Sequence, residues 1–338
     1  MSDKKINLDE KFYIAGASGM VGSAIYRALR MKGYGEKKNN GKILTPNRKE
    51  LDLSKSADVG NWFKINKPSI VILAAAKVGG ILANSNQPAD FLLENLKIQT
   101  NIINSSFENN VKRFLFLGSS CIYPKFAKQP IKEEELLKGE LEKTNESYAI
   151  AKICGIKLCE ALRLQYGFDA ISLMPTNLYG PGDNYNIQNS HVMAALIRKF
   201  YYAKKYKLAE VTCFGDGSAL REFLHVDDLG AAAIFAMENW DPNDRCSPKY
   251  KESLPLTFLN VGTGYDISIK DLTKKISQFI GYEGKTKWDI SKPNGTPKKQ
   301  LDISRILKIG WAPQIKLEDG IKSTIEDFEK NLHLYIRN

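Results

Sequence analysis

Three glycines between an apolar strand and a helical segment constrain the fold more than any other feature of this sequence. Gly16, Gly19 and Gly22 are spaced G-x-x-G-x-x-G directly after the apolar run Phe12–Ala15. In such a loop the first glycine permits a tight turn, the second lets the backbone approach a pyrophosphate, and the third lets helix and strand pack closely. The helix N-terminus offers N–H groups and a positive dipole end to the phosphates. The spacing predicts a dinucleotide-binding loop, and a structural glycine turn is the alternative.

Short apolar runs alternate with longer helical patterns through the first half of the chain. Alternating strands and helices are typical of a parallel sheet that is covered on both faces. We therefore expect an α/β fold, a Rossmann-type doubly wound parallel sheet. The expected strands are Phe12–Ala15, Lys42–Thr45, Ser69–Ala74, Arg113–Leu117 and Asp169–Met174, and the expected helices are Met20–Lys32, Leu92–Asn109 and Tyr148–Tyr166.

The second half of the chain has a different pattern. A helix is expected from His191 to about Lys205, and Asn189 or Ser190 could cap it. A further strand is expected within Leu256–Gly264, and a last helix from about Leu317. We expect a smaller, discontinuous C-terminal substrate domain. The expected division is 1–180 with 222–262 for the dinucleotide domain, and 181–221 with 263–333 for the substrate domain.

The residues after the second expected strand favour NADP over NAD. An acid at this position would hold the ribose hydroxyls of NAD, but the first charge met is Arg48. A guanidinium suits a 2′-phosphate, and Ser18 could add one hydrogen bond. Asp52 lies too far along the chain to change this choice. A solvated loop arginine is the alternative interpretation of Arg48.

A phenol and an ammonium share one helix face, because Tyr148 and Lys152 are spaced i and i+4. An unperturbed tyrosine has a pKa of about 10, and a nearby positive charge lowers it. Such a tyrosine can move a proton to or from a sugar oxygen while a nicotinamide moves a hydride. Ser119 and Ser120 follow the fourth strand, where ligands bind in open α/β sheets. The tyrosine–lysine spacing is common by chance, so the prediction depends on its conjunction with the glycine loop and the serines.

With these motifs the sequence resembles the extended short-chain dehydrogenase/reductases over essentially its whole length, including Gly310–Pro313 before the last helix. The resemblance implies a catalytic set of Ser119, Tyr148 and Lys152 beside a bound nicotinamide. It also implies these contacts with the dinucleotide: Gly16, Ala17, Ser18, Gly19, Met20, Val21, Gly22, Arg48, Leu117, Gly118, Ser119, Ser120, Tyr148, Lys152, Pro175, Thr176, Asn177, Leu178 and His191.

Five segments in order resemble one group within that family, the GDP-L-fucose synthases, which act as 3,5-epimerase and 4-reductase. They are Ala74–Ile81, Ser120–Pro124, Pro175–Asn186, Asn189–Phe200 and Leu220–Asp228. The Thr-Asp-Glu set of sugar dehydratases is absent, and Cys121 stands in its place. The implied substrate is GDP-4-keto-6-deoxy-D-mannose, a GDP-sugar, and the implied cofactor is NADP.

Inversion at C3 and C5 of such a ketone requires two acid/base groups, since each proton is removed and one is returned from the other side. The resemblance assigns these roles to Cys121 and His191. The position of His191 at a helix start disfavours its charged form. Ser119 and Tyr148 would stabilise the enolate oxygen. A packing role for Cys121 and a capping or surface role for His191 are the alternatives.

The resemblance also points to contacts with the nucleotide. Lys199 and Arg221 would bind the pyrophosphate, Phe214 would stack near the guanine or the pyrophosphate, and Asp302 would face the sugar nucleotide. His225 is expected to be structural.

Two rival functions are disfavoured. Arg48 and the absent Thr-Asp-Glu set argue against a 4-epimerase or 4,6-dehydratase that retains NAD. A non-catalytic protein that senses NADP would not need Cys121, Tyr148 and Lys152, all of which are present.

Composition and charge exclude several classes of partner, location and site. The net charge of the 338 residues is +11, but the lysines are scattered without interleaved aromatics, so nucleic acid is disfavoured as a partner. The N-terminus has no apolar signal region and no apolar run could span a bilayer, so a cytoplasmic protein without membrane contact is expected. Five cysteines without C-x-x-C spacing argue against a metal site or a disulfide framework.

The helix expected at Leu92–Asn109 has apolar residues around more of its girth than one sheet contact requires. This predicts a subunit interface, and family members commonly form homodimers through helices of this kind. The candidate residues are Leu93, Leu96, Ile98, Ile102, Ile103 and Phe107.

Overall fold

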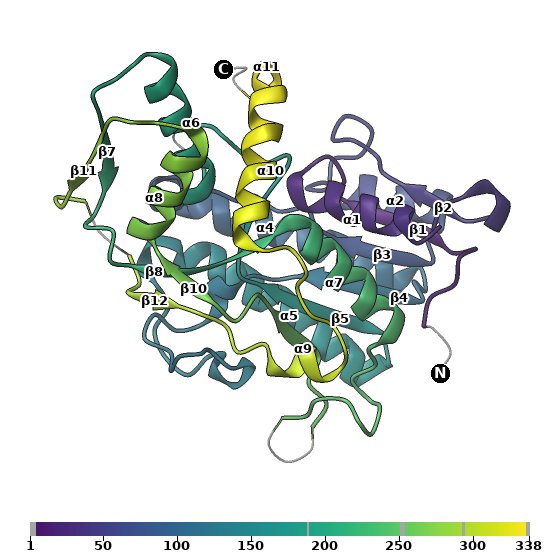
Figure 1. Cartoon of the computed structure of the whole chain (residues 1–338). Coiled ribbons are helices and arrows are strands. Elements are labelled where there is room, and N and C mark those ends of the chain that lie inside the picture. Colours follow the sequence, from purple (N-terminus) through teal and green to yellow (C-terminus); the bar gives the residue numbers. More distant parts are fainter. Residues whose placement is uncertain (1–4, 188, 251–253, 293–294, 336–338) are drawn as a thin grey trace.

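A six-stranded parallel sheet in the order β2-β1-β3-β4-β5-β9 forms the centre of the computed structural model (Figure 1). The model describes residues 5–187, 189–250, 254–292 and 295–335. The middle strands are buried along their whole length, as strands covered on both faces must be. The strands are β1 (Lys11–Ala15), β2 (Lys42–Leu44), β3 (Ile70–Leu73), β4 (Arg113–Leu117), β5 (Ala170–Pro175) and β9 (Phe258–Val261). The expected α/β, Rossmann-type doubly wound fold is confirmed.

Helices cover both faces of this sheet. On one face α1 (Met20–Met31) packs against α7 (Val226–Asn239). On the other, α4 (Pro88–Glu108) packs between α2 (Ser56–Asn66) and α5 (Glu146–Tyr166). The strand order reverses between β1 and β3, so the loop after β1 lies at the crevice where open α/β sheets bind ligands.

A second group of elements gathers at one end of the molecule, away from β2 (Figure 1). Its apolar side chains form a separate buried cluster that includes Phe200, Ile276 and Ile321. The larger elements are α6 (Val192–Lys205), β7 (Glu210–Phe214), β8 (Leu220–His225), α8 (Ile269–Ile280), β11 (Lys285–Asp289) and α10 (Leu317–Lys330). The short ones are β6 (Asn177–Tyr179), β10 (Asp266–Ser268), β12 (Lys298–Lys299) and α11 (Leu332–Tyr335).

The remaining short elements are α3 (Ile81–Asn86), α9 (Ser304–Lys308) and the 3₁₀ turns η1 (Lys37–Asn39), η2 (Ser120–Ile122), η3 (Glu133–Glu135) and η4 (Lys143–Asn145). Residues 301–311, within the segment expected in the substrate domain, contribute Leu301, Ile306 and Trp311 to the core of the parallel sheet. The two cores support the division into two domains, which stays a proposal. Residues 1–4, 188, 251–253 and 293–294 of that division lie outside the described residues.

Several boundaries differ from the sequence-based expectation. The helix expected from His191 begins at Val192, and His191 itself is the N-cap residue, so neither Asn189 nor Ser190 caps it. The strand expected within Leu256–Gly264 is only Phe258–Val261. Helix α4 begins earlier than expected because a proline fits its first turn.

The prediction that six residues of this helix face a partner subunit is wrong for two of them. Ile102 and Ile103 are fully buried in the core of the parallel sheet. Phe107 is partly buried and its ring contacts Tyr166 and Phe168 of the same chain. The apolar side chains around α4 are therefore partly buried against α2 and α5, which flank it.

Candidate active site

The glycine turn after β1 has the geometry that a bound dinucleotide requires. Gly16 has a φ of +90° and a Cβ on it would lie 2.7 Å from the backbone of Ala75. A Cβ on Gly22 would lie 2.1 Å from the carbonyl oxygen of Gly16, so the third glycine is needed for helix and strand to pack. Gly19 is the N-cap of α1, and no side chain caps the helix or places an acid in its first turn. The free helix N-terminus and the open Cβ position at Gly19 fit a pyrophosphate.

Lys152 is held under the carboxyl end of β4. Its ammonium donates to the carbonyl oxygen of Leu117 at 2.8 Å and lies 4.9 Å from the ring centre of Phe116. It lies 5.9 Å from the ring centre of Tyr148, one helical turn away. Burial lowers the pKa of Lys152 to about 8. Helix α5 thus presents both side chains to the strand end that carries Ser119.

The electrostatics of Tyr148 differ from the sequence-based expectation. Burial raises the pKa of its phenol, the charge of Cys121 raises it further, and a hydrogen bond with Ser119 lowers it. The expected lowering by Lys152 is absent because the lysine is itself desolvated and its ammonium binds a carbonyl. Tyr148 is therefore a protonated phenol near neutral pH, and it forms a hydrogen bond with Ser119.

Three hydrogen bonds hold Cys121 in place. Its sulfur accepts from Nδ2 of Asn145 at 3.3 Å and from Nζ of Lys299 at 3.4 Å. Its backbone N–H donates to Oγ of Ser119 at 3.2 Å, which fixes the η2 turn. The Cys121 side chain is half-buried. Burial lowers the pKa of the Arg221 guanidinium, and the negative charge of Cys121 raises it by a smaller amount.

His191 reaches the same region from the second group of elements. It precedes α6, and the loop before it is tied to the loop after β3 by a hydrogen bond from Gly80 N–H to Asn189 O at 3.1 Å. Its side chain has exposed surface, but the protein atoms around it desolvate it. This desolvation lowers the pKa of His191, and the charge of Lys299 lowers it further. Lys299 is therefore near both predicted acid/base groups.

The residues predicted to bind nucleotide lie on the second group of elements. Nζ of Lys199 donates to Thr212 O at 2.6 Å and lies 5.0 Å from the ring centre of Phe214, which is exposed. Arg221 lies on β8 beside Lys299 of β12. Asp302 instead accepts the N–H of Ser304 at the start of α9, so its local contact is with the backbone.

The other predicted cofactor contacts lie along the carboxyl ends of the strands. Gly118 packs so closely that a Cβ would lie 2.3 Å from the sulfur of Met174. Thr176 and Asn177 both donate to the carbonyl oxygen of Glu222, so β5 and β6 are joined to β8. Ser18 and Arg48 are exposed. Hydrogen bonds from Ser54 lower the pKa of Asp52, and the charge of Arg48 makes a smaller contribution. His225, expected to be structural, is buried and caps α7 by accepting the N–H of Asp227.

Sequence reasoning missed Asn145 and Lys299. Asn145 precedes α5 in a stretch that carries no motif, and Lys299 lies in a two-residue strand that the sequence pattern does not predict. No spacing rule connects either residue to Cys121, since Lys299 is 178 positions away. The one available signal is that Asn145 lies three residues before Tyr148, on the same approach to the site.

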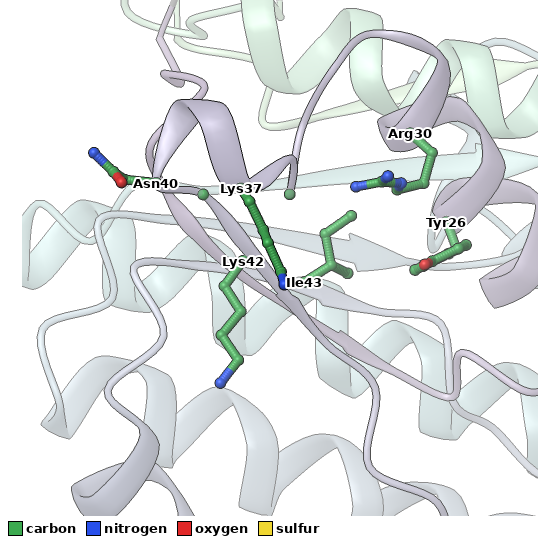
Figure 2. A pocket seen from close by; sticks show the side chains of 8 residues that line it. Tyr26, Arg30, Lys37, Asn40, Lys42 and Ile43 are labelled. Carbon is green, nitrogen blue, oxygen red and sulfur yellow. The ribbon is translucent and has the colours of Figure 1, made fainter.

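A basic hollow also lies between α1 and the start of β2 (Figure 2). Tyr26 and Arg30 of α1 face it, as do Lys37 and Ile43. Arg30 is in the last turn of α1 and Lys42 begins β2, so the hollow belongs to the amino ends of the strands. The catalytic candidates lie at the carboxyl ends, so this hollow is not part of their site.

Among the described residues there is neither a cluster of metal-binding side chains nor a membrane-spanning helix. No group of three or more His, Cys, Asp or Glu side chains there could hold a metal ion. None of the described helices combines the length and the apolar character needed to cross a membrane.

The model of the NAD dependent epimerase/dehydratase family matches residues 12–246, which include the glycine turn, Cys121, Tyr148 and His191. The chain belongs to the NAD dependent epimerase/dehydratase family. Its Rossmann-type sheet, glycine turn and serine–tyrosine–lysine group agree with this membership.

Relatives in this family match almost the whole chain. A GDP-L-fucose synthase of Arabidopsis thaliana is 49% identical, with 98% of this chain and 96% of the relative aligned. A GDP-L-fucose synthase of Escherichia coli is 48% identical, with 95% and 97% aligned. A GDP-mannoheptose C4 reductase from Campylobacter jejuni, solved with NADP bound, is 37% identical, with a TM-score of 0.84 and 96% and 99% aligned.

Proposed function

We propose that this member of the NAD dependent epimerase/dehydratase family converts GDP-4-keto-6-deoxy-D-mannose to GDP-L-fucose. The reaction is an epimerisation at C3 and C5 followed by reduction of the C4 ketone with NADPH. The observation that carries the proposal is the contact of Ser119 with both Cys121 and Tyr148, with Lys299 linking Cys121 to His191. Two acid/base groups beside an oxyanion-binding pair are what this sequence of steps requires.

The chain's own side chains account for every proton in the reaction. Ser119 and Tyr148 bind the O4 oxygen and stabilise the enolate that forms when a proton leaves C3 or C5. Cys121 and His191 remove each proton and return one to the opposite face. In the reduction, Tyr148 donates its phenolic proton to O4. NADPH, when bound, supplies the hydride for C4.

The same geometry supports a set of residues for binding NADP. The amides at the start of α1 would bind the pyrophosphate, since no side chain caps them. Arg48 and Ser18 would bind the 2′-phosphate, and Tyr148 with Lys152 would hold the nicotinamide ribose. The remaining predicted contacts, from Leu117 to Ser120 and from Pro175 to Leu178, line the carboxyl ends of β4 and β5. Lys199, Phe214, Arg221 and Asp302 are proposed for the GDP part of the substrate.

The test separates epimerisation from reduction. The protein is incubated in deuterated water with the keto-sugar nucleotide and NADP⁺, which cannot reduce the ketone, and deuterium at C3 and C5 is measured. We expect exchange at both positions, and its loss in Cys121→Ser, because a serine hydroxyl does not ionise usefully near neutral pH. In a separate assay the parent protein should oxidise NADPH on adding the same substrate.

Each alternative gives a different result. A simple C4 reductase would oxidise NADPH without exchange at C3 and C5, and a sensor protein would do neither. If Cys121→Ser exchanges both positions as fast as the parent, the cysteine is a packing residue and its assigned role is wrong.

We propose two further properties at the level of the whole protein. Leu93 of α4 and Ile150 and Leu164 of α5 are exposed apolar side chains on two helices that pack together, which supports a homodimer through these helices. A cytoplasmic location is supported by the five cysteines, all of which are free although two are exposed.

A further inference from the structure

The sulfur of Cys121 accepts hydrogen bonds from two nitrogen donors that come from distant parts of the chain. Nδ2 of Asn145 lies 3.3 Å away and Nζ of Lys299 lies 3.4 Å away. An amide nitrogen and an ammonium can only donate, so the sulfur must be the acceptor in both contacts. A thiol sulfur is a weak acceptor, whereas a thiolate is charged and accepts strongly. An opposite charge beside an acidic group favours the ionised form of that group, and Lys299 supplies such a charge at hydrogen-bond distance from the sulfur.

The position of Lys299 is set by buried contacts. Its two-residue strand β12 pairs with β8, where Lys299 is opposite Arg221. Two residues after Lys299, Leu301 donates its N–H to the buried carboxylate of Glu222 at 2.8 Å. Lys298, the neighbour of Lys299, directs its ammonium to Asp266 at 3.2 Å instead. The chain thus holds two adjacent lysines in one strand and brings only one ammonium into contact with the sulfur.

Cys121 and Lys299 line a small pocket together with several other charged and titratable groups. Lys125 and Glu142 form an ion pair at 2.9 Å at its edge, and Glu142 lowers the net positive charge there. Arg221 of β8 and Tyr148 of α5 are close enough to Cys121 for its charge to act on the pKa of each. His191 faces Lys299 from the start of α6, and the lysine charge lowers its pKa. Among these groups Lys299 is the cation whose contact with the sulfur is a hydrogen bond.

We propose that Lys299 is a positioning residue for epimerisation: together with Asn145 it holds Cys121 in the thiolate form and couples that charge to His191. This inference rests on the proposed function for its catalytic meaning, but the contact itself concerns only this chain. Removing the positive charge would favour the protonated form of both partners. The pH range in which Cys121 and His191 are both deprotonated would therefore move upward, while the affinity for NADPH stays unchanged.

The first measurement follows the ionisation of Cys121 without any substrate. Thiolate absorbance in the ultraviolet is recorded against pH, and the curve of the matching variant that also carries Cys121→Ser is subtracted. In Lys299→Met we expect the midpoint to rise by about one pH unit or more, because a neighbouring opposite charge shifts ionisation by about 1–3 units. Lys299→Arg keeps the charge and should leave the midpoint near that of the parent. Lys298→Met is the matched control and should also leave it in place.

The second measurement is deuterium exchange at C3 and C5 with NADP⁺ present, as a function of pH. Lys299→Met should slow exchange about tenfold near neutral pH, in proportion to the lost thiolate, and the rate should recover at higher pH. NADPH affinity should not change. A merely structural lysine would lower exchange equally at all pH values.

The outcomes separate the two proposals. Identical thiolate midpoints in the parent and Lys299→Met, or an equal shift in Lys298→Met, would overturn the role of Lys299. A shifted midpoint in a protein that exchanges neither position would leave the contact established and would refute the proposed epimerisation. If Lys299→Met does not fold, Lys299→Gln keeps a polar side chain without the charge and carries the same expectation.

Discussion

The ammonium of Lys152 is buried between a strand-end carbonyl and two aromatic rings, which is an unfavourable place for a charge. Its pKa of about 8 follows from this desolvation. The phenol of Tyr148 responds to burial in the opposite direction, since its charged form is the phenolate. At the scale of single residues, the site therefore keeps a tyrosine protonated and brings a lysine close to neutrality.

The buried lysine predicts a pH-dependent stability. Its pKa falls from an ordinary 10.5 to about 8, so the unfolded chain binds more protons between these values. Stability of the parent should therefore rise as pH increases through this window, and the unfavourable burial is fully present below pH 8. Lys152→Met should be more stable at pH 7 by about 2 kcal/mol, after allowing for the lost hydrogen bond. Denaturant unfolding at pH 7 and 10 measures this, and a variant with the parent's pH slope would contradict it.

Tyr148 carries the proton for reduction in the proposed mechanism. Tyr148→Phe should lower NADPH oxidation by about 10²–10⁴, the usual effect of losing general acid catalysis, and leave NADPH affinity nearly unchanged. Stopped-flow reduction and a fluorescence titration of NADPH measure the two quantities. Reduction at the parent's rate would remove Tyr148 from the proton path.

Arg48 is exposed after β2, where the chain has no acid for ribose hydroxyls. Arg48→Ala should weaken NADPH binding by roughly tenfold or more and leave NADH binding nearly unchanged, because only the former has a 2′-phosphate for a guanidinium. Titration with both cofactors is the measurement. An equal loss for both would mean that Arg48 does not bind the phosphate.

At the scale of elements, the glycines of the turn between β1 and α1 have different structural roles. A Cβ on Gly22 would meet the Gly16 carbonyl oxygen at 2.1 Å, whereas a Cβ on Gly19 would lie 3.5 Å from it, an ordinary contact. The close approach of strand and helix therefore depends on Gly22. The open face of Gly19 is the surface that a pyrophosphate would contact.

This difference predicts two separable defects. Gly22→Ala should lower the free energy of unfolding by about 2 kcal/mol or more, since backbone must move to relieve the overlap. Gly19→Ala should keep the parent's stability but weaken NADPH binding, because the new methyl group occupies the phosphate's place. Thermal unfolding and cofactor titration of both variants decide this. A stable Gly22→Ala, or a Gly19→Ala with full affinity, would contradict the assignment.

At the scale of the whole molecule, two hydrophobic cores meet where the predicted catalytic residues gather. Ser119, Cys121 and Tyr148 come from the parallel sheet and its helices, whereas His191 and Lys299 come with the second group of elements. The site is complete only when both groups are packed together. Glu222 contributes to that packing, since its buried carboxylate accepts N–H groups from Thr263, Gly264 and Leu301.

The homodimer is the prediction that belongs to this scale. Leu93 of α4 is 53% exposed, and a charge there should weaken the proposed interface without disturbing the core. Leu93→Glu should shift the protein from dimer to monomer in sedimentation or light scattering. Met31, 88% exposed on α1 on the other face of the sheet, is the matched control, and Met31→Glu should stay dimeric. A monomeric parent protein would refute the interface.

The sequence by itself determined the fold class and the local parts of the site. Glycine spacing, continuous apolar strands and the i, i+4 pair of Tyr148 and Lys152 are short-range patterns, so they are readable without a structure. The same patterns could not show that Ile102 and Ile103 are core residues, because the face a helix buries depends on its neighbours.

Only the tertiary structure decided what surrounds Cys121. Asn145 and Lys299 reach its sulfur from 24 and 178 positions away, through a turn and a two-residue strand that carry no sequence signal. Burial likewise decided the charges of Tyr148 and Lys152, whose pKa values move in directions that spacing alone did not predict. The physical reason is that solvation and long-range contacts exist only once the chain has folded, whereas periodicity and turn chemistry are properties of neighbouring residues.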